Sequence, residues 1–286
     1  MAADPWDGRP SREAHFLALI EARYPSLERR NLTPILDTLR QTKSPREIAL
    51  IRKASELAAL GILEAMKSTR PGVFEYQIAA AARFTFLANG ARFEGYNPIA
   101  GGGTNAWMGH YSRNADALEA GDLVLMDYAP DLRYYTSDVT RMWPVSGRYT
   151  EAQRTLARFI LEYRQAFFRY IRPGITPDEV LVRARRDMEG VLAKTRFAND
   201  HHRKAAEEML TFRGHLQHPV GMTVHDPGTI WGKPFQEGVV FTVDPMMWIP
   251  DEHLYVRMED TIVVTRDGME NFTPTLASTP EEIEAA

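Results

Sequence analysis

Residues 121–140 read GDLVLMDYAPDLRYYTSDVT. Four apolar residues precede Asp127, and residues 134–143 form a second segment typical of a strand. A hairpin that turns at residues 132–133, midway between the two aspartates, would place Asp127 directly opposite Asp138. Two buried carboxylates at that spacing repel each other unless a cation or a proton lies between them. The stretch therefore predicts a hairpin beside a bound cation.

A second pair of carboxylates repeats this arrangement. Asp244 follows the apolar run 239–243, and Glu259 lies within a predicted strand at 254–264. Their midpoint falls in the turn Ile-Pro-Asp-Glu at residues 249–252. We therefore expect a second hairpin with two facing carboxylates, in contexts typical of interior strands rather than of solvated loops.

An imidazole completes the donor set. His218 lies in the segment HLQHPVGMTVHD, residues 215–226, and the chain contains no cysteine. Any bound metal must therefore use oxygen and imidazole ligands. Four carboxylates and a histidine form an oxygen-rich site with room for two divalent ions, which suits Mn²⁺, Co²⁺, Fe²⁺ or Zn²⁺ better than a structural zinc. Paired ions of this kind activate water for hydrolysis.

The order of the expected elements repeats along the chain. Ser44 caps a predicted helix to about residue 66, and a second helix covers 75–87 before the first strands. Thr150 then caps a helix to about residue 171, and Thr176 caps another to about residue 192 before strands return. Arg-Pro-Gly ends a helix in each half, at 70–72 and 172–174, whereas residues 199–203 read as a polar loop. The pattern predicts an α+β fold with two pseudo-symmetric halves, and coincidence between common helix breakers is the alternative.

Composition bounds the remaining organisation. Residues 1–42 predict a helical extension or linker, and residues 43–286 the main domain. Apolar residues make up 44% and charged residues 25% of the 286, which is typical of a globular protein. A formal charge of −4 without a long basic block argues against nucleic acid as a partner. The absence of a long apolar run argues against a membrane span. We expect a cytoplasmic protein, or a secreted one if a signal is missing from this chain, and consider a homodimer.

Five motifs occur in the order that resembles the M24 metallopeptidases of the pita-bread fold, in the aminopeptidase P and prolidase branch. The resemblance begins near residues 43–47 and extends to about residue 272. The five motifs are the pair His110-Tyr111 and the segments at 121–127, 137–141, 218–226 and 257–260. It implies a pita-bread domain with a dinuclear site, in which two divalent ions are bound, Mn²⁺ first among the candidates.

The resemblance also implies roles for single residues. Asp127 would hold one ion, Asp138 and Glu259 would bridge both, and His218 with Asp244 would hold the other. The residues at the substrate would be His110, His225, Tyr96 and Arg257. The implied reaction is hydrolysis of the bond before proline in short proline-containing peptides by a metal-bridging hydroxide, with His110, His225 and Asp244 as the catalytic residues.

Three departures from the family pattern stand in this chain. Asp244 occupies a position where the family has glutamate, and Gly214 one where it often has a further histidine, with His215 one place later. Forty-two residues are also too few for the N-terminal domain of full-length members. The shorter carboxylate motivates a catalytically silent peptide- or protein-binding module as an alternative function. A creatinase-like amidino hydrolase is a weaker one. The sequence does not distinguish dipeptides from longer peptides as substrates.

Overall fold

The computed structural model describes residues 8–286, so the first seven residues of the expected extension lie outside it. The chain divides into two compact units, Met1–Leu36 and Asp37–Ala286. Helix α1 (Arg12–Arg23) lies in the first unit and is capped by Ser11, whose side chain accepts a hydrogen bond from the amide of Ala14. Helix α2 (Thr33–Gln41) ends just before the expected domain start at residue 43.

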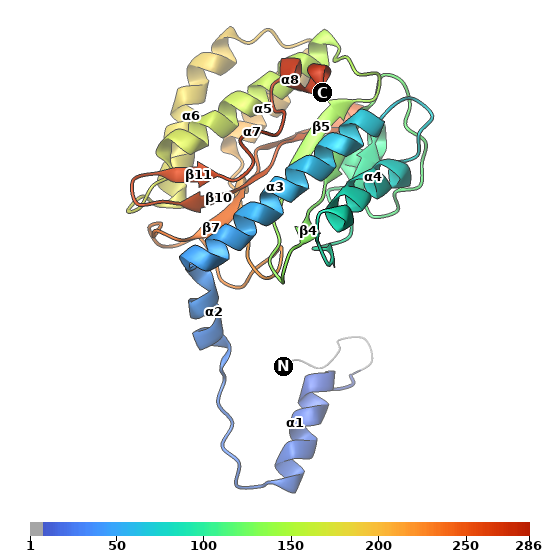
Figure 1. Ribbon diagram of the computed structural model, residues 1–286. Coiled ribbons are helices and arrows are strands. Elements are labelled where there is room, and N and C mark those ends of the chain that lie inside the picture. The colour runs from blue at the N-terminus through green and yellow to red at the C-terminus, as the bar shows by residue number, and fades with distance from the viewer. Residues whose placement is uncertain (1–7) are drawn as a thin grey trace. The chain divides into compact units, whose positions relative to one another are not determined.

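The first half of the main unit pairs two helices with a three-stranded antiparallel sheet of order β2-β3-β5. Its elements are α3 (Pro45–Ser68), α4 (Glu75–Ala88), β2 (Ile99–Gly102), η1 (Gly103–Trp107), β3 (Leu123–Asp127) and β5 (Thr140–Pro144), with the short pair β1 (Phe93–Glu94) and β4 (Pro130–Asp131) beside them. Helices α3 and α4 pack against each other on one side of the molecule (Figure 1).

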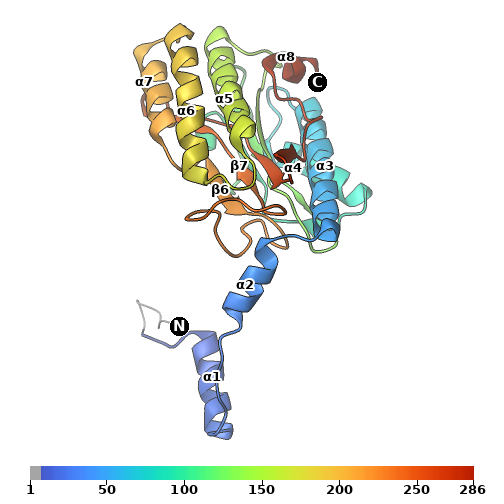
Figure 2. The same cartoon turned by 90° about the vertical axis from the view of Figure 1, so that its left-hand side faces the viewer.

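The second half repeats the order, with a third helix added. Its elements are α5 (Glu151–Tyr170), α6 (Pro177–Lys194), α7 (Asp200–Thr211), β6 (Leu216–Pro219), β7 (Val240–Val243), β8 (Met246–Ile249), η2 (Pro250–Glu252), β9 (Leu254–Arg257), β10 (Asp260–Val264), β11 (Met269–Asn271) and α8 (Pro280–Ala285). Helices α5, α6 and α7 stand in a row (Figure 2) beside a sheet of order β11-β10-β7-β6.

The α+β class and the two halves predicted from the sequence are confirmed. Ser44, Thr150 and Thr176 each form a capping box at the start of their helix, as the sequence indicates. The glycines of the two Arg-Pro-Gly segments adopt nearly the same backbone, with φ of 85° at Gly72 and 83° at Gly174. That left-handed conformation is available to glycine without strain, so the same local chemistry ends a helix in both halves.

The register predicted for the first hairpin is wrong by two residues. Asp127 pairs with Thr140 rather than with Asp138. The turn lies at Arg133 and Tyr134, whose φ angles of 55° and 69° are both positive, and Leu132 bridges Tyr135 across it. Two positive φ angles are typical of a two-residue turn of type I′, which usually contains asparagine or glycine. The sequence carries neither here, so the position of the turn could not be recognised.

The register predicted for the second hairpin is confirmed. Met246 pairs with Arg257 and Ile249 with Leu254 around the turn at Pro250–Glu252. Val243 pairs with Asp260 on the far side of Asp244. Asp244 and Glu259 therefore occupy matching positions between these pairs, as the midpoint argument requires.

Residues 199–203 are not the polar loop that we expected. They begin α7, where Asn199 caps the helix by accepting a hydrogen bond from the amide of His202. The second ring of the His201-His202 pair is buried, and its Nε2 lies 3.0 Å from the carboxylate of Glu252 in η2. The polar residues of this segment therefore cap α7 and connect it to the β8–β9 hairpin through hydrogen bonds.

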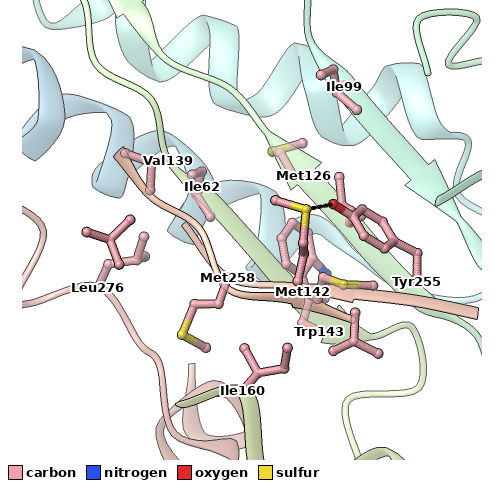
Figure 3. Close-up of a cluster of buried hydrophobic side chains, with 14 of the residues drawn as sticks. Ile62, Ile99, Met126, Val139, Met142, Trp143, Ile160, Tyr255, Met258 and Leu276 are labelled. Atoms are coloured by element: carbon pink, nitrogen blue, oxygen red, sulfur yellow. Dashed lines mark hydrogen bonds between the residues drawn. The ribbon is translucent and has the colours of Figure 1, made fainter. Parts of the chain in front are cut away.

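The core of the main unit is shared by both halves. Figure 3 shows Ile62 from α3 and Met126 from β3 in one cluster with Ile160 from α5 and Tyr255 from β9. The Tyr255 hydroxyl donates to the sulfur of Met246 at 3.4 Å. Within residues 8–286, no helix combines the length and hydrophobicity that a bilayer span requires.

Candidate metal centre

A cavity of about 440 Å³ collects residues from both halves. Eight of the nine site residues expected from the sequence line it: Tyr96, His110, Asp127, Asp138, His218, His225, Asp244 and Arg257. Glu259 lies fully buried directly behind the wall, in contact with Arg257. The structure therefore brings together every residue that the motifs singled out.

The first hairpin supplies two carboxylates that share one neutral donor. Asp127 ends β3, and Asp138 lies two residues before β5. The Tyr96 hydroxyl lies 2.6 Å from Asp127 Oδ1 and 3.0 Å from Asp138 Oδ1. Burial, with repulsion from Glu259 and Asp127, raises the pKa of Asp138 well above its usual range. Burial and the same two aspartates raise the pKa of Tyr96, which keeps its proton for this bond.

Glu259 has one oxygen satisfied and one free. Its Oε2 accepts from Thr140 Oγ1 at 3.0 Å and also from Arg257. Its Oε1 is buried, and no donor among residues 8–286 reaches it. The next residue, Asp260, points elsewhere, since it binds Arg141 at 2.7 Å and Arg164 at 2.6 Å. A buried carboxylate oxygen without a donor is costly, and a cation is the group that would satisfy it.

Asp244 is held from two sides. Arg257 Nε donates to its Oδ1 at 3.0 Å, and Gln217 Nε2 donates to its Oδ2. The side chain is fully buried. Burial raises the pKa of Asp244 well above its usual range, although the guanidinium of Arg257 opposes that shift.

Arg257 is the cation that the structure places among these carboxylates. Its Nη2 lies 3.0 Å from Asp127 Oδ2 and also contacts Glu259, while its Nε contacts Asp244. Burial opposes its charge, but the three carboxylates raise the pKa of Arg257 well above its usual range. One guanidinium facing four buried carboxylates leaves an excess of negative charge when all of them are ionised, which favours the binding of further cations.

Three histidines continue the site toward the open side of the cavity. His218 Nε2 lies 3.3 Å from Asp138 Oδ2, and its Nδ1 lies 3.1 Å from the carbonyl oxygen of Pro219. A proton on Nδ1 would be donated to that carbonyl, which leaves the Nε2 lone pair for a metal. The ring of His225 lies 3.9 Å from that of His218 and 6.4 Å from that of His110, centroid to centroid.

The donor set fits divalent ions. Two groups of residues in the described chain bring their ligand atoms within 4.8 Å of one another: Asp127 with Asp138 and Glu259, and Asp138 with His218 and His225. Asp138 belongs to both groups, as expected of a bridging ligand. Neither group found in residues 8–286 contains Asp244, so its role as a ligand stays a prediction.

The position of the family's further histidine lies beside the ring of Phe212. A Cβ at Gly214 would meet that ring, which is partly exposed and would have to shift. His215 does not replace it, because its ring is fully buried and its Nε2 donates to the carbonyl oxygen of Met209 at 2.8 Å. Burial lowers the pKa of His215 to about 4, so it is a neutral structural residue.

Sequence reasoning missed Gln217 and Thr140, which contact Asp244 and Glu259. Both lie within the segments quoted above, Gln217 in β6 directly before His218 and Thr140 in β5 two residues after Asp138, and a polar residue near a predicted ligand was the available signal. It also missed Glu75, whose carboxylate accepts from the amides of Gly102 and Asp116 and so fixes the ends of the segment that carries His110.

The family of the chain follows from comparison with known proteins. The model of metallopeptidase family M24 matches residues 49–266. The chain belongs to family M24. This membership accounts for the carboxylate-rich site, because a metallopeptidase family implies divalent ions, and for the pita-bread fold of the two halves.

Members with known names and structures lie close to this M24 chain. Xaa-Pro aminopeptidase of Escherichia coli is 35% identical over 271 residues, which cover 88% of this chain and 60% of that protein. Human Xaa-Pro aminopeptidase 3 is 31% identical, with 87% of this chain and 52% of that protein covered. A structure of an Escherichia coli aminopeptidase P variant in complex with substrate matches with a TM-score of 0.82 at 32% identity, over 98% of this chain and 69% of that chain. The chain thus spans about three fifths of its bacterial relative.

Proposed function

We propose that this M24 protein hydrolyses the bond before proline in short peptides and releases the N-terminal residue. The observation that carries the proposal is the convergence of Asp127, Asp138 and His218 in a single cavity, with Glu259 buried against the first two. His110 and His225 lie in the same cavity on its open side. The named relatives, which are Xaa-Pro aminopeptidases, supply the substrate class.

Asp127, Asp138, Glu259 and His218 would hold the ions, with Asp244 as the proposed fifth ligand. Divalent ions at this place supply a water of lowered pKa and polarise the peptide carbonyl. Carboxylate-rich donor sets suit Mn²⁺, which we propose as the native metal. The solved zinc-substituted Escherichia coli aminopeptidase P, in complex with product, makes Zn²⁺ the first alternative to compare.

The other residues handle orientation and protons. Burial and the neighbouring His218 and His110 lower the pKa of His225, so its imidazole is neutral at neutral pH and donates one N–H toward the developing oxyanion. His110 faces it across the cavity and would donate to the carbonyl or the leaving nitrogen. The raised pKa of Asp244 suits a carboxylate that takes up a proton and passes it on.

The test is hydrolysis of matched peptides by the purified chain loaded with Mn²⁺, Co²⁺ or Zn²⁺. We expect cleavage of Xaa-Pro dipeptides and tripeptides, and no cleavage of the same peptides with alanine in place of proline. A metal-loaded, folded chain that cleaves none of them would favour the silent binding module, for which the shortened carboxylate at Asp244 is the motivating observation. The dipeptide and tripeptide rates together decide the length preference.

The cytoplasmic location and the homodimer expected from the sequence stay predictions. Fractionation of cells that express the protein tests the first, and light scattering of the purified chain tests the second.

A further inference from the structure

One polar side chain in the cavity wall has no part in the chemistry above. Gln217 lies in β6 directly before His218 and lines the cavity. Its amide nitrogen donates to Oδ2 of Asp244, while Arg257 Nε donates to Oδ1 of the same carboxylate at 3.0 Å. The two oxygens of Asp244 therefore have different partners, one neutral and one charged.

The charged partner defines which oxygen faces the other carboxylates. Arg257 contacts Asp127 and Glu259 through Nη2 and Asp244 Oδ1 through Nε. Arg257 thus links Oδ1 of Asp244 to Asp127 and Glu259, which both belong to one metal-compatible group. The other oxygen, Oδ2, accepts the hydrogen bond from Gln217. Asp244 could therefore bind an ion through Oδ1 and still accept the hydrogen bond from Gln217 at Oδ2.

We propose that Gln217 is a positioning residue that holds Asp244 so that Oδ1 is presented to the metal. The aspartate is one methylene shorter than the glutamate that the family pattern has at this position, so a small rotation of its carboxylate costs it a ligand contact. A hydrogen bond to the second oxygen of a ligating carboxylate restricts that rotation. This inference rests on the proposed function and deepens it.

The chemistry of an amide suits this task. A lysine or arginine at residue 217 would bring a second fixed cation to Asp244 and compete with the ion. A glutamate would add a fifth carboxylate to a site that already has an excess of negative charge. The glutamine side chain donates one bond and leaves the charge balance unchanged.

The first experiment measures metal affinity and needs no substrate. Gln217→Met keeps the length of the side chain and removes the donor. We expect the apparent Kd of the weaker Mn²⁺ site, measured by calorimetry on metal-free protein, to rise by about 10- to 100-fold. Gln217→Ala serves as a second variant. The matched control is Gln41→Ala, since Gln41 Nε2 donates at 2.6 Å to the backbone oxygen of Thr229 outside the cavity. The control should leave the Kd unchanged.

The second experiment repeats the substitution in an Asp244→Glu background. The longer side chain moves the carboxylate past the reach of the Gln217 amide, so Gln217→Met should change the Kd by less than about threefold there. Equal effects in both backgrounds, or an unchanged Kd in the first, would overturn the proposal. Thermal melting of metal-free Gln217→Met checks folding, and if that variant melts early the comparison is made with Gln217→Ala.

Failure of this inference can be told apart from failure of the proposed function. If the proposed function is right and the inference is wrong, Gln217→Met and Gln217→Ala should cleave Xaa-Pro peptides at the same rate as the unsubstituted protein, with an unchanged Kd for Mn²⁺. A binding module with the expected Kd changes would bind Mn²⁺ as described and cleave nothing.

Discussion

The two carboxylate hairpins differ in what holds their acids. In the first, Asp127 and Asp138 share the neutral hydroxyl of Tyr96. In the second, Asp244 and Glu259 are bound by the guanidinium of Arg257, which belongs to the same hairpin. Arg257 also contacts Asp127 of the first hairpin at 3.0 Å, whereas no lysine or arginine among residues 8–286 forms an ion pair with Asp138. The second hairpin therefore carries a cation of its own, and Asp138 of the first depends most on added cations for charge balance.

This difference predicts unequal dependence on metal. The first hairpin supplies Asp138, which belongs to both metal-compatible groups, while Asp244 of the second belongs to neither in the described chain. The structural repeat thus does not extend to the chemistry of the two pairs.

The largest effect is expected for Asp138→Ala. Removal of the carboxylate common to both groups should abolish stoichiometric Mn²⁺ binding and lower the melting temperature of the protein in the presence of metal, because bound ions stabilise the folded state. Asp244→Ala should retain at least one ion. Metal analysis after gel filtration and thermal melting measure both. Full occupancy in Asp138→Ala would show that the first hairpin does not dominate.

The next effect concerns stability without metal. Arg257→Ala leaves three buried carboxylates without their cation and should destabilise the metal-free protein by about 3–5 kcal/mol. Tyr96→Phe removes a single neutral hydrogen bond and should cost about 1 kcal/mol. Urea unfolding at neutral pH in the presence of chelator compares the two variants. Similar losses from both would mean that the charge of Arg257 gives the second hairpin no advantage.

Substitution of His225 and of His218 should separate an effect on turnover from an effect on metal binding. His225→Ala should retain bound metal and lower turnover about 10²-fold, on the order of the loss of one oxyanion donor. His218→Ala should lose metal affinity first, because its Nε2 lies against Asp138 of the first hairpin. Turnover at saturating metal and the metal content of both variants decide this. Equal metal loss from the two would place His225 among the ligands.

The smallest effect is a pH dependence of the metal-free protein. The pKa of Asp138 is raised in the folded state, so its contribution to stability is present in full below its ordinary pKa near ~4 and is lost as the pH rises through the raised value. Asp138→Asn removes this loss, so the free energy of unfolding of the metal-free variant should fall less between pH 4 and pH 8 than that of the unsubstituted protein. Parallel curves of unfolding free energy against pH for the two proteins would contradict the shift.

Much of the site could be predicted because its information is local. Apolar runs before Asp127 and Asp244 indicate buried strand ends. Helix caps such as Thr150 and Thr176 can be recognised from the sequence because their hydrogen-bond partners lie only three residues away. The second hairpin was predictable for the same reason, since its turn contains Pro250.

The remainder depends on tertiary packing. The turn at Arg133 and Tyr134 adopts positive φ angles without the usual turn residues, so the register shifted by two. Gln217 meets Asp244 across 27 positions of sequence, which no local pattern records. His202 is buried against Glu252 of η2, 50 residues further along the chain, and the polar sequence around His202 gives no sign of that contact.

The shared core has a consequence for how such a fold can arise and be divided. Ile62 and Met126 pack in one cluster with Ile160 and Tyr255, so either half alone would expose a large apolar surface to water. A single half could therefore persist only by pairing with another copy of itself. Two fragments of this chain, divided near residue 147 between β5 and α5, should accordingly be poorly soluble apart and recover a folded state when expressed together.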